Sequence, residues 1–240
     1  AIGRVAMGGG DTSGDNNIAM GTNAMDALTS GACNIAMGLN ALGAATTGND
    51  NVAIGRLALG AGTLTGASNI AIGATAGDAI TSGACNIAIG LDALGAATTS
   101  SHNIAIGYAA LIASVDDGEN NVAIGRAPMS GGDVSGDSNV AIGYATMDAL
   151  TSGADNVAIG RNALGSNTTG CQNIVIGLNA GETEAAMCNN IIIGTTAAGG
   201  TGNGGSFDNI IMGQVAGCAL SSGQYNVFVG TGAGRNVTSG

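Results

Sequence analysis

The chain has 240 residues, of which 45 are glycine, one is proline, one is histidine and none is tryptophan. Charged residues make up 9% and aromatic residues 2%, and the formal net charge is −11. The absence of a basic stripe and of stacking aromatics excludes a nucleic-acid binder. A single histidine, His102, argues against a histidine-based metal or acid–base enzyme. No apolar run approaches the roughly 18 residues of a membrane span, so we expect no membrane insertion.

A short repeat runs through residues 1–240 as one array. Each copy reads Asn, then Ile or Val, then a middle residue that is usually Ala, then a second aliphatic residue and Gly. The spacing is 17 or 18 residues, with one of 19. The missing terminal caps predict either a piece of a longer protein or a filament built end to end. The repeated asparagines are Asn17, Asn34, Asn51, Asn69, Asn86, Asn103, Asn121, Asn139, Asn156, Asn173, Asn190, Asn209 and Asn226.

The period predicts the fold class. Seventeen residues are too few for a repeat of two helices, and glycine at this density opposes helix formation. The alternation in Asn-Ile-Ala-Ile-Gly is typical of a short strand. Two or three such strands with tight turns make one coil of a β-solenoid, and the closing glycine recurs fourteen times. We therefore predict an all-β solenoid, a parallel β-roll or β-helix of about 14 coils.

The repeat also predicts where side chains point. The aliphatic pair, for example Ile70 and Ile72, is expected to face the core, and the middle residue to face outward. An outward middle row would be an apolar contact face for another chain. The alternative is a flattened coil in which the alanines also pack inside. The members named for this contact face are Ala53, Ala71, Ala88, Ala105, Val175, Ile192, Ile211 and Phe228.

Two repeated positions have structural explanations. The asparagine row is expected to form a ladder in which each amide bonds its neighbours or caps a turn. The closing glycine is expected at a bend with positive φ, or at a close approach of two backbones. We read both rows as structural, with no ligand role.

Few residues suggest chemistry. Arg4, Arg56, Arg126 and Arg161 each follow the repeated glycine, and we read them as partners of the acidic turns. The turns at 11–15, 116–119 and 133–137 are rich in oxygen ligands, yet none has a calcium-loop spacing, so we expect no cofactor and keep Ca²⁺ only as a weak alternative. No catalytic motif is present, and His102 is read as a surface residue.

The cysteines and sequons give further predictions. Cys171 and Cys188 hold the same place in adjacent coils, where a spacing of about 4.8 Å would permit a disulfide. Cys33 and Cys85 lie three coils apart, too far for a bond within the chain. Asn167 and Asn236 begin formal N-glycosylation sequons.

The unit Asn-x-Ala-Ile-Gly-x-x-Ala-Leu, as at 86–94 and 156–164, resembles the head repeat of trimeric autotransporter adhesins and the repetitive shaft of phage tail fibres. The resemblance implies a left-handed β-roll at a cell or virion surface. It also implies self-association, as a lateral oligomer such as a trimer or as an end-to-end filament, and a glycan or cell-surface receptor bound by parts outside this chain. The function it implies is a stiff, non-catalytic extracellular rod. The alternative is a repeated binding face for a periodic ligand such as polysaccharide or ice, although the threonines that ice binding favours do not recur in every coil.

Overall fold

The computed structural model describes residues 1–9, 13–114, 118–200 and 206–239. They form two compact units, residues 1–120 and residues 121–240. Each unit is a stack of coils built from the same repeat. The prediction of a single array over 1–240 stays a prediction.

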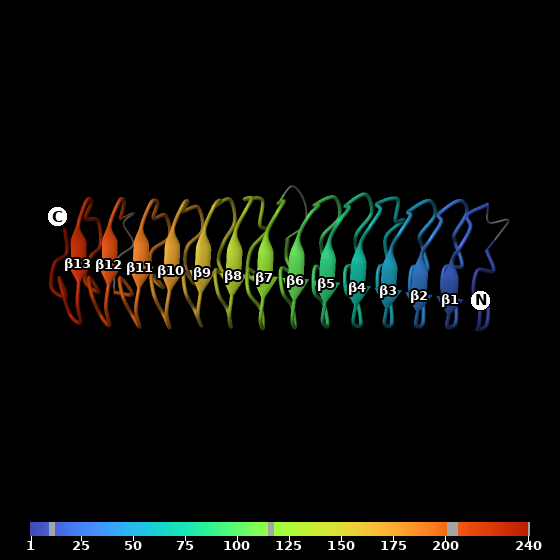
Figure 1. Ribbon diagram of the computed structural model, residues 1–240, viewed down its shortest axis with the longest axis horizontal. Helices are drawn as coiled ribbons and strands as arrows, with labels where there is room; N and C mark the ends of the chain where they lie inside the picture. The colour runs from blue at the N-terminus through green and yellow to red at the C-terminus, as the bar shows by residue number, and fades with distance from the viewer. Residues whose placement is uncertain (10–12, 115–117, 201–205, 240) are drawn as a thin grey trace. The chain divides into compact units, whose positions relative to one another are not determined.

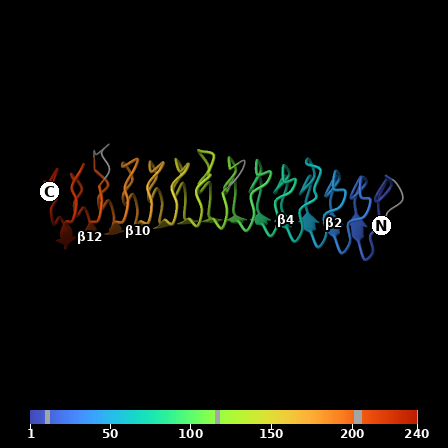
Figure 2. The same ribbon diagram turned by 90° about the horizontal axis from the view of Figure 1, so that it is seen from above.

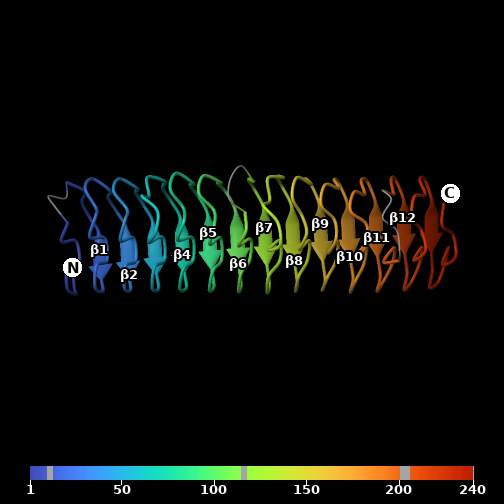
Figure 3. The same cartoon turned by 180° about the vertical axis from the view of Figure 1, so that it is seen from behind.

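Every strand is three residues long, and the strands of each unit pair in parallel with their neighbours in chain order (Figures 1 and 3). Pairing is in register, so that Ile70 lies beside Ile87 and Ala71 beside Ala88. No helix occurs in the described residues, and the predicted all-β solenoid is confirmed. Unit 1 contains β1 (Ile18–Met20), β2 (Ile35–Met37), β3 (Val52–Ile54), β4 (Ile70–Ile72), β5 (Ile87–Ile89) and β6 (Ile104–Ile106). Unit 2 contains β7 (Val122–Ile124), β8 (Val140–Ile142), β9 (Val157–Ile159), β10 (Ile174–Ile176), β11 (Ile191–Ile193), β12 (Ile210–Met212) and β13 (Val227–Val229).

The expectation of two or three strands per coil is wrong, because each described coil has at most one strand, and outside the strands only isolated bridges occur, as at Cys171 and Cys188. The cause is local backbone geometry at three repeated places, as the coil of β5 shows. Cys85 before the asparagine has φ of 58°, and Asp92 and Leu94 after the glycine have φ of 57° and 50°. Left-handed residues interrupt extended backbone, so the rest of the coil turns instead of forming strands. Figure 2 shows the strands along one side of each unit and the turns on the other.

The closing glycine has the conformation that its repetition predicted. Gly38 has φ of 141°, and a Cβ atom there would lie 2.4 Å from the carbonyl oxygen of Gly55 in the next coil. Positive φ and a close backbone approach both require glycine at this place. The bend therefore ends each strand and lets the coils stack at strand spacing.

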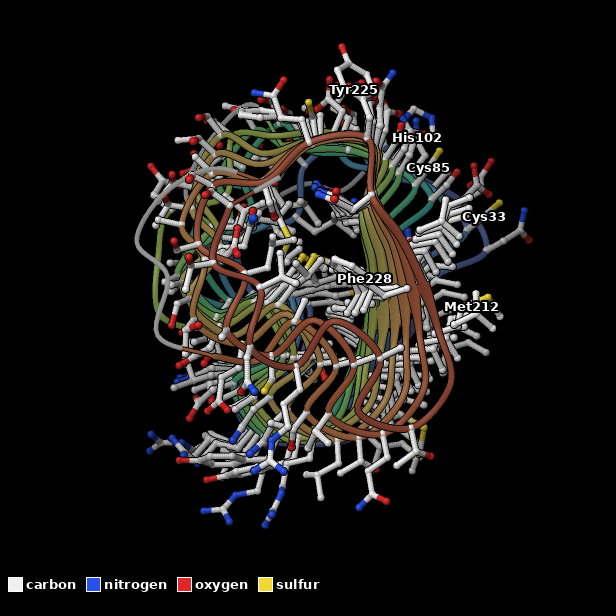
Figure 4. The ribbon with its side chains drawn as sticks, turned by 90° about the vertical axis from the view of Figure 1, so that its left-hand side faces the viewer. Cys33, Cys85, His102, Met212, Tyr225 and Phe228 are labelled. Carbon is white, nitrogen blue, oxygen red and sulfur yellow. The ribbon has the colours of Figure 1, made fainter. Side chains whose placement is uncertain are left out.

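The direction of the strand side chains is the reverse of the main prediction. Ala53, Ala71, Ala88 and Ala105 are at most 1% exposed, whereas Ile72 is 37% exposed. In unit 2, Val175, Ile192 and Ile211 are buried. Phe228 points into the interior of its coil, and Met212 points outward from the opposite side of the sheet (Figure 4).

The row named as a contact face is therefore core, and the aliphatic pair, which both the main prediction and the flattened-coil alternative placed inside, lies outside. The aliphatic residues on either side of it form the outer surface of the sheet. The interior that the middle row faces also holds buried residues of the turn that follows the closing glycine, which in unit 1 include Met25, Leu42, Leu59, Leu94 and Leu111.

Candidate functional site

The asparagine row is the most regular polar feature of the molecule. In unit 1, the backbone N–H of Asn69 donates to Oδ1 of Asn51 at 2.9 Å, and Nδ2 of Asn69 donates to the same oxygen at 3.2 Å. Nδ2 also donates to the carbonyl oxygen of Gly83 at 2.9 Å. Oδ1 of Asn69 in turn accepts the backbone N–H of Asn86 at 3.0 Å. Each amide therefore joins three successive coils.

Unit 2 repeats the same pattern. Nδ2 of Asn173 donates to Oδ1 of Asn156 at 2.8 Å and to the carbonyl oxygen of Met187 at 2.6 Å. The backbone N–H of Asn190 donates to Oδ1 of Asn173 at 3.1 Å. The ladder members Asn156, Asn173 and Asn190 are at most 1% exposed. The predicted ladder is confirmed within each unit, and its buried amides are satisfied by neighbouring coils, as buried polar groups require.

A second row of side-chain hydrogen bonds lies in the threonine-rich turns. Oγ1 of Thr29 donates to the carbonyl oxygen of Thr46 at 2.9 Å, and Oγ1 of Thr81 donates to that of Thr98 at 3.1 Å. In unit 2, Oγ1 of Thr151 donates to the carbonyl oxygen of Thr168 at 3.0 Å. These hydroxyl protons bind the next coil and are not available to order water or to donate to a ligand.

The paired cysteines lie in adjacent coils as predicted, but they form no disulfide. Cys171 and Cys188 form a parallel bridge, and the backbone N–H of Cys171 donates to Sγ of Cys188 at 3.1 Å. Both thiols are free. The thiol hydrogen bond with Cys188 and burial raise the pKa of Cys171 to about 11.

Cys33, Cys85 and His102 lie on the surface of unit 1, whereas Cys218 is a half-buried free thiol in unit 2. Cys33 and Cys85 are exposed thiols, and both point outward at the corner that precedes the sheet (Figure 4). His102 occupies the same place in its coil and is also exposed. The surface reading of His102 is confirmed.

The two sequons differ in accessibility. Asn167 is fully buried, and its Oδ1 accepts the backbone N–H of Gly170 at 2.9 Å. Glycosylation there is incompatible with the folded chain, so this prediction is wrong. Asn236 is exposed, and its modification stays a prediction.

The charged turns form no recognisable site in the described residues. No group of three or more His, Cys, Asp or Glu side chains that could hold a metal ion occurs there. Of the acidic turns, residues 11, 12, 116 and 117 lie outside the described residues. Arg4, Arg56 and Arg161 make no ion pair in the described part of the chain, so pairing with the acidic turns is wrong for these three. The Arg126 guanidinium lies over the Tyr144 ring, 5.4 Å from its centroid.

A buried carboxylic acid was not anticipated from the sequence. Glu184 is fully buried, and its Oε2 accepts the backbone N–H and the hydroxyl of Ser206 at 3.1 and 2.7 Å. Oε1 has no partner within the described residues. Burial outweighs these two bonds and raises the pKa of Glu184 to about 7. Its burial could have been predicted from its position in the repeat, because Leu28, Ile80 and Leu150 occupy the same position in other coils.

The described surface offers no concave site for a small molecule, since no pocket is found in it. A search of the same residues for helices long and apolar enough to cross a membrane finds none. Comparison with known proteins finds no matching family model, no matching curated protein and no matching solved structure.

Proposed function

We propose that this chain is a non-catalytic structural element, a stiff segment of an extracellular or virion-surface shaft or filament. The observation that carries the proposal is the asparagine ladder. Its amides join coil to coil inside each unit, in addition to the backbone bonds of the parallel strands. Buried hydrogen-bond networks of this kind resist local opening, which a load-bearing spacer requires.

The threonine row supports the same proposal over a ligand-binding one. A face that orders ice or binds polysaccharide needs free donors and acceptors at regular spacing. Here the hydroxyls of Thr29, Thr81 and Thr151 donate to the neighbouring coil. We therefore give the structural role precedence.

Electron microscopy tests the role. Negatively stained particles should be elongated, either as short rods or as filaments. Isolated globular particles would reject a shaft or filament.

Proteolysis tests the mechanism with adjacent residues as a matched pair. Asn103→Ala removes an amide that donates to the Gly118 carbonyl oxygen at 2.8 Å, whereas His102→Ala changes an exposed neighbour. With proteinase K, the parent chain and His102→Ala should survive equally long, and Asn103→Ala should be cut several times faster. Equal survival of all three would remove the ladder as the source of stiffness.

A further inference from the structure

The outer surface of the sheet carries two rows of aliphatic side chains, the residues that open and close each strand. We call these rows the aliphatic face of each unit. All of them are Ile, Val or Met, with no charge among them. Ile54, Ile70 and Ile72 are 36–37% exposed in the middle of unit 1. In unit 1 the face consists of Ile18, Met20, Ile35, Met37, Val52, Ile54, Ile70, Ile72, Ile87, Ile89, Ile104 and Ile106.

The size of this face exceeds what a monomer leaves in contact with water. Soluble monomers rarely expose contiguous apolar patches larger than a few hundred Å². The exposed parts of twelve aliphatic side chains in unit 1 are on the order of the 800 Å² that each partner contributes to a standard interface. The face of one unit is therefore large enough to hold a stable partner.

The border of the face also exposes large apolar and aromatic side chains. The residue after each closing glycine lies next to the aliphatic face, and in unit 1 this row includes Leu39, Leu91 and Tyr108 at 45–49% exposure. Arg56 stands in the same row. Large apolar, tyrosine and arginine side chains around an uncharged centre are typical of protein–protein contacts. The centre of the face offers a charged polymer no countercharge, and in unit 1 its border row offers only Arg4 and Arg56.

The spacing of the face identifies the partner. Parallel strands repeat about every 4.8 Å, so the side chains form ridges and grooves with that period. A second copy has the same period, and its ridges can fill these grooves over every strand instead of at one place. Packed sheets lie about 10 Å apart with strand directions within about 30° of each other. A partner with another period would lose register after a few strands.

We propose that the aliphatic face binds the aliphatic face of a second copy of this chain, so that two sheets pack face to face. The interface is isologous, with the same surface buried on both copies. Burial of the face leaves the polar turns and the acidic side chains toward solvent. The inference rests on the proposed structural role and adds the surface through which such chains associate laterally.

Sedimentation equilibrium of a charged double variant and a matched control tests the proposal. The variant is Ile54→Lys with Ile72→Lys, on the aliphatic face. The control is Thr47→Lys with Ser82→Lys, which adds the same charge at exposed turn residues. Circular dichroism and melting temperature establish that both remain folded.

The parent and the control should have the mass of two chains or more at about 1–100 µM. The face variant should have the mass of one chain, with the dissociation constant raised at least about 100-fold, because charges buried in an interface are strongly unfavourable. If the lysine variant does not fold, Ile54→Ser with Ile72→Ser replaces it, with the same expected direction. A parent of single-chain mass throughout this range, or an equal loss of association in variant and control, would overturn the proposal.

Further outcomes distinguish binding of a second copy from binding of a periodic ligand, and the interface from the structural role. If the parent has single-chain mass while the face lysines abolish thermal hysteresis or retention on a polysaccharide gel, the face binds a periodic ligand and the proposal is wrong. Elongated particles of single-chain mass would likewise overturn the interface, yet leave the structural role standing. Globular particles would instead reject the role itself.

Discussion

The core of unit 1 and the C-terminal coils of unit 2 fill the same space in opposite ways. In unit 1 the strand contributes a small residue and the opposite turn a large one, as with Ala88 and Leu94. In the last coils of unit 2 the strand contributes a large residue and the turn only glycine or alanine, as with Ile211 and Gly217. Across the coil, a Cβ at Gly217 would lie 3.2 Å from Cδ1 of Ile211. The interior volume of a coil is fixed by the backbone, and the two sides share it.

One coil of unit 1 shows that core side chains other than the strand residue and the turn residue facing it can also fill the interior. The turn of β4 has Gly77 where its neighbours have leucine, yet the strand residue remains Ala71. A Cβ at Gly77 would lie 3.0 Å from Cδ1 of Ile80 and 3.1 Å from Cδ2 of Leu59. Compensation therefore acts through whichever core side chain reaches the space, as close packing requires.

The largest expected effect comes from giving unit 2 the small strand residue of unit 1. Ile211→Ala leaves a cavity, because Gly217 offers no side chain to fill it. We expect a loss of about 2–5 kcal/mol in the free energy of unfolding, measured with denaturant. The control Ile210→Ala, 38% exposed on the aliphatic face, should lose less than about 1 kcal/mol. Equal losses would refute the volume argument.

The converse exchange gives unit 1 the large strand residue of unit 2. Ala88→Ile overpacks its coil and should lower stability by about 1–3 kcal/mol. Adding Leu94→Gly should restore part of the loss, because glycine frees the space and accepts the left-handed backbone of that residue. A double-mutant cycle should give a favourable coupling of about 0.5 kcal/mol or more. Strict additivity would contradict shared volume.

A smaller effect is expected where glycine serves both backbone and packing. Gly217 has φ of 55°, and an added Cβ would also lie 3.2 Å from Cδ2 of Phe228. Gly217→Ala should therefore lower stability by about 1–2 kcal/mol, mostly through left-handed strain. Thermal unfolding checks this value, and an unchanged melting temperature would contradict the expected strain at Gly217.

A pH dependence is expected at a place where unit 2 departs from the core of unit 1. Glu184 stands where Ile80 stands in unit 1, and its pKa is raised from 4.5 to about 7 in the folded chain. The folded state therefore binds more protons than the unfolded state between these values. The Glu184 contribution should stabilise at low pH and be lost as pH rises through about 7.

Glu184→Gln is the matched variant for this prediction. Melting temperatures of the parent and the variant, measured from pH 4.5 to 8, should diverge, with the parent losing stability relative to the variant as pH rises. Parallel profiles would show that Glu184 titrates normally.

The repeat period, the asparagine ladder and the glycine bend could be predicted because each depends on one position recurring at a fixed place. Which strand side chains face the core could not be predicted from the alternation alone, because in Ile-Ala-Ile either the alanine or the two isoleucines can face inward. A parity argument would have decided it. Asn69 and Ala71 are two residues apart and so point to the same side. A buried ladder therefore places the alanine row in the core.

The number of strands and the isolated departures were less accessible from sequence. Left-handed φ at Leu94 runs against the ordinary preference of leucine, so propensity gave no sign of it. The burial of Asn167 and Glu184 was signalled only by their position in the repeat, seven residues after the closing glycine, where Leu28, Ile80 and Leu150 are also buried. The polar character of these two residues pointed the other way.

The central claim is that the middle strand residue is core and its neighbours are surface. Denaturant unfolding of Ala71→Lys and Ile72→Lys, two adjacent residues that are 1% and 37% exposed, tests it most directly. We expect Ala71→Lys to unfold the coil or to lose more than about 3 kcal/mol, because it buries an unpaired charge, while Ile72→Lys, compared at a concentration too low for chains to associate, stays within about 1 kcal/mol of the parent. A stable Ala71→Lys beside an unfolded Ile72→Lys would contradict it.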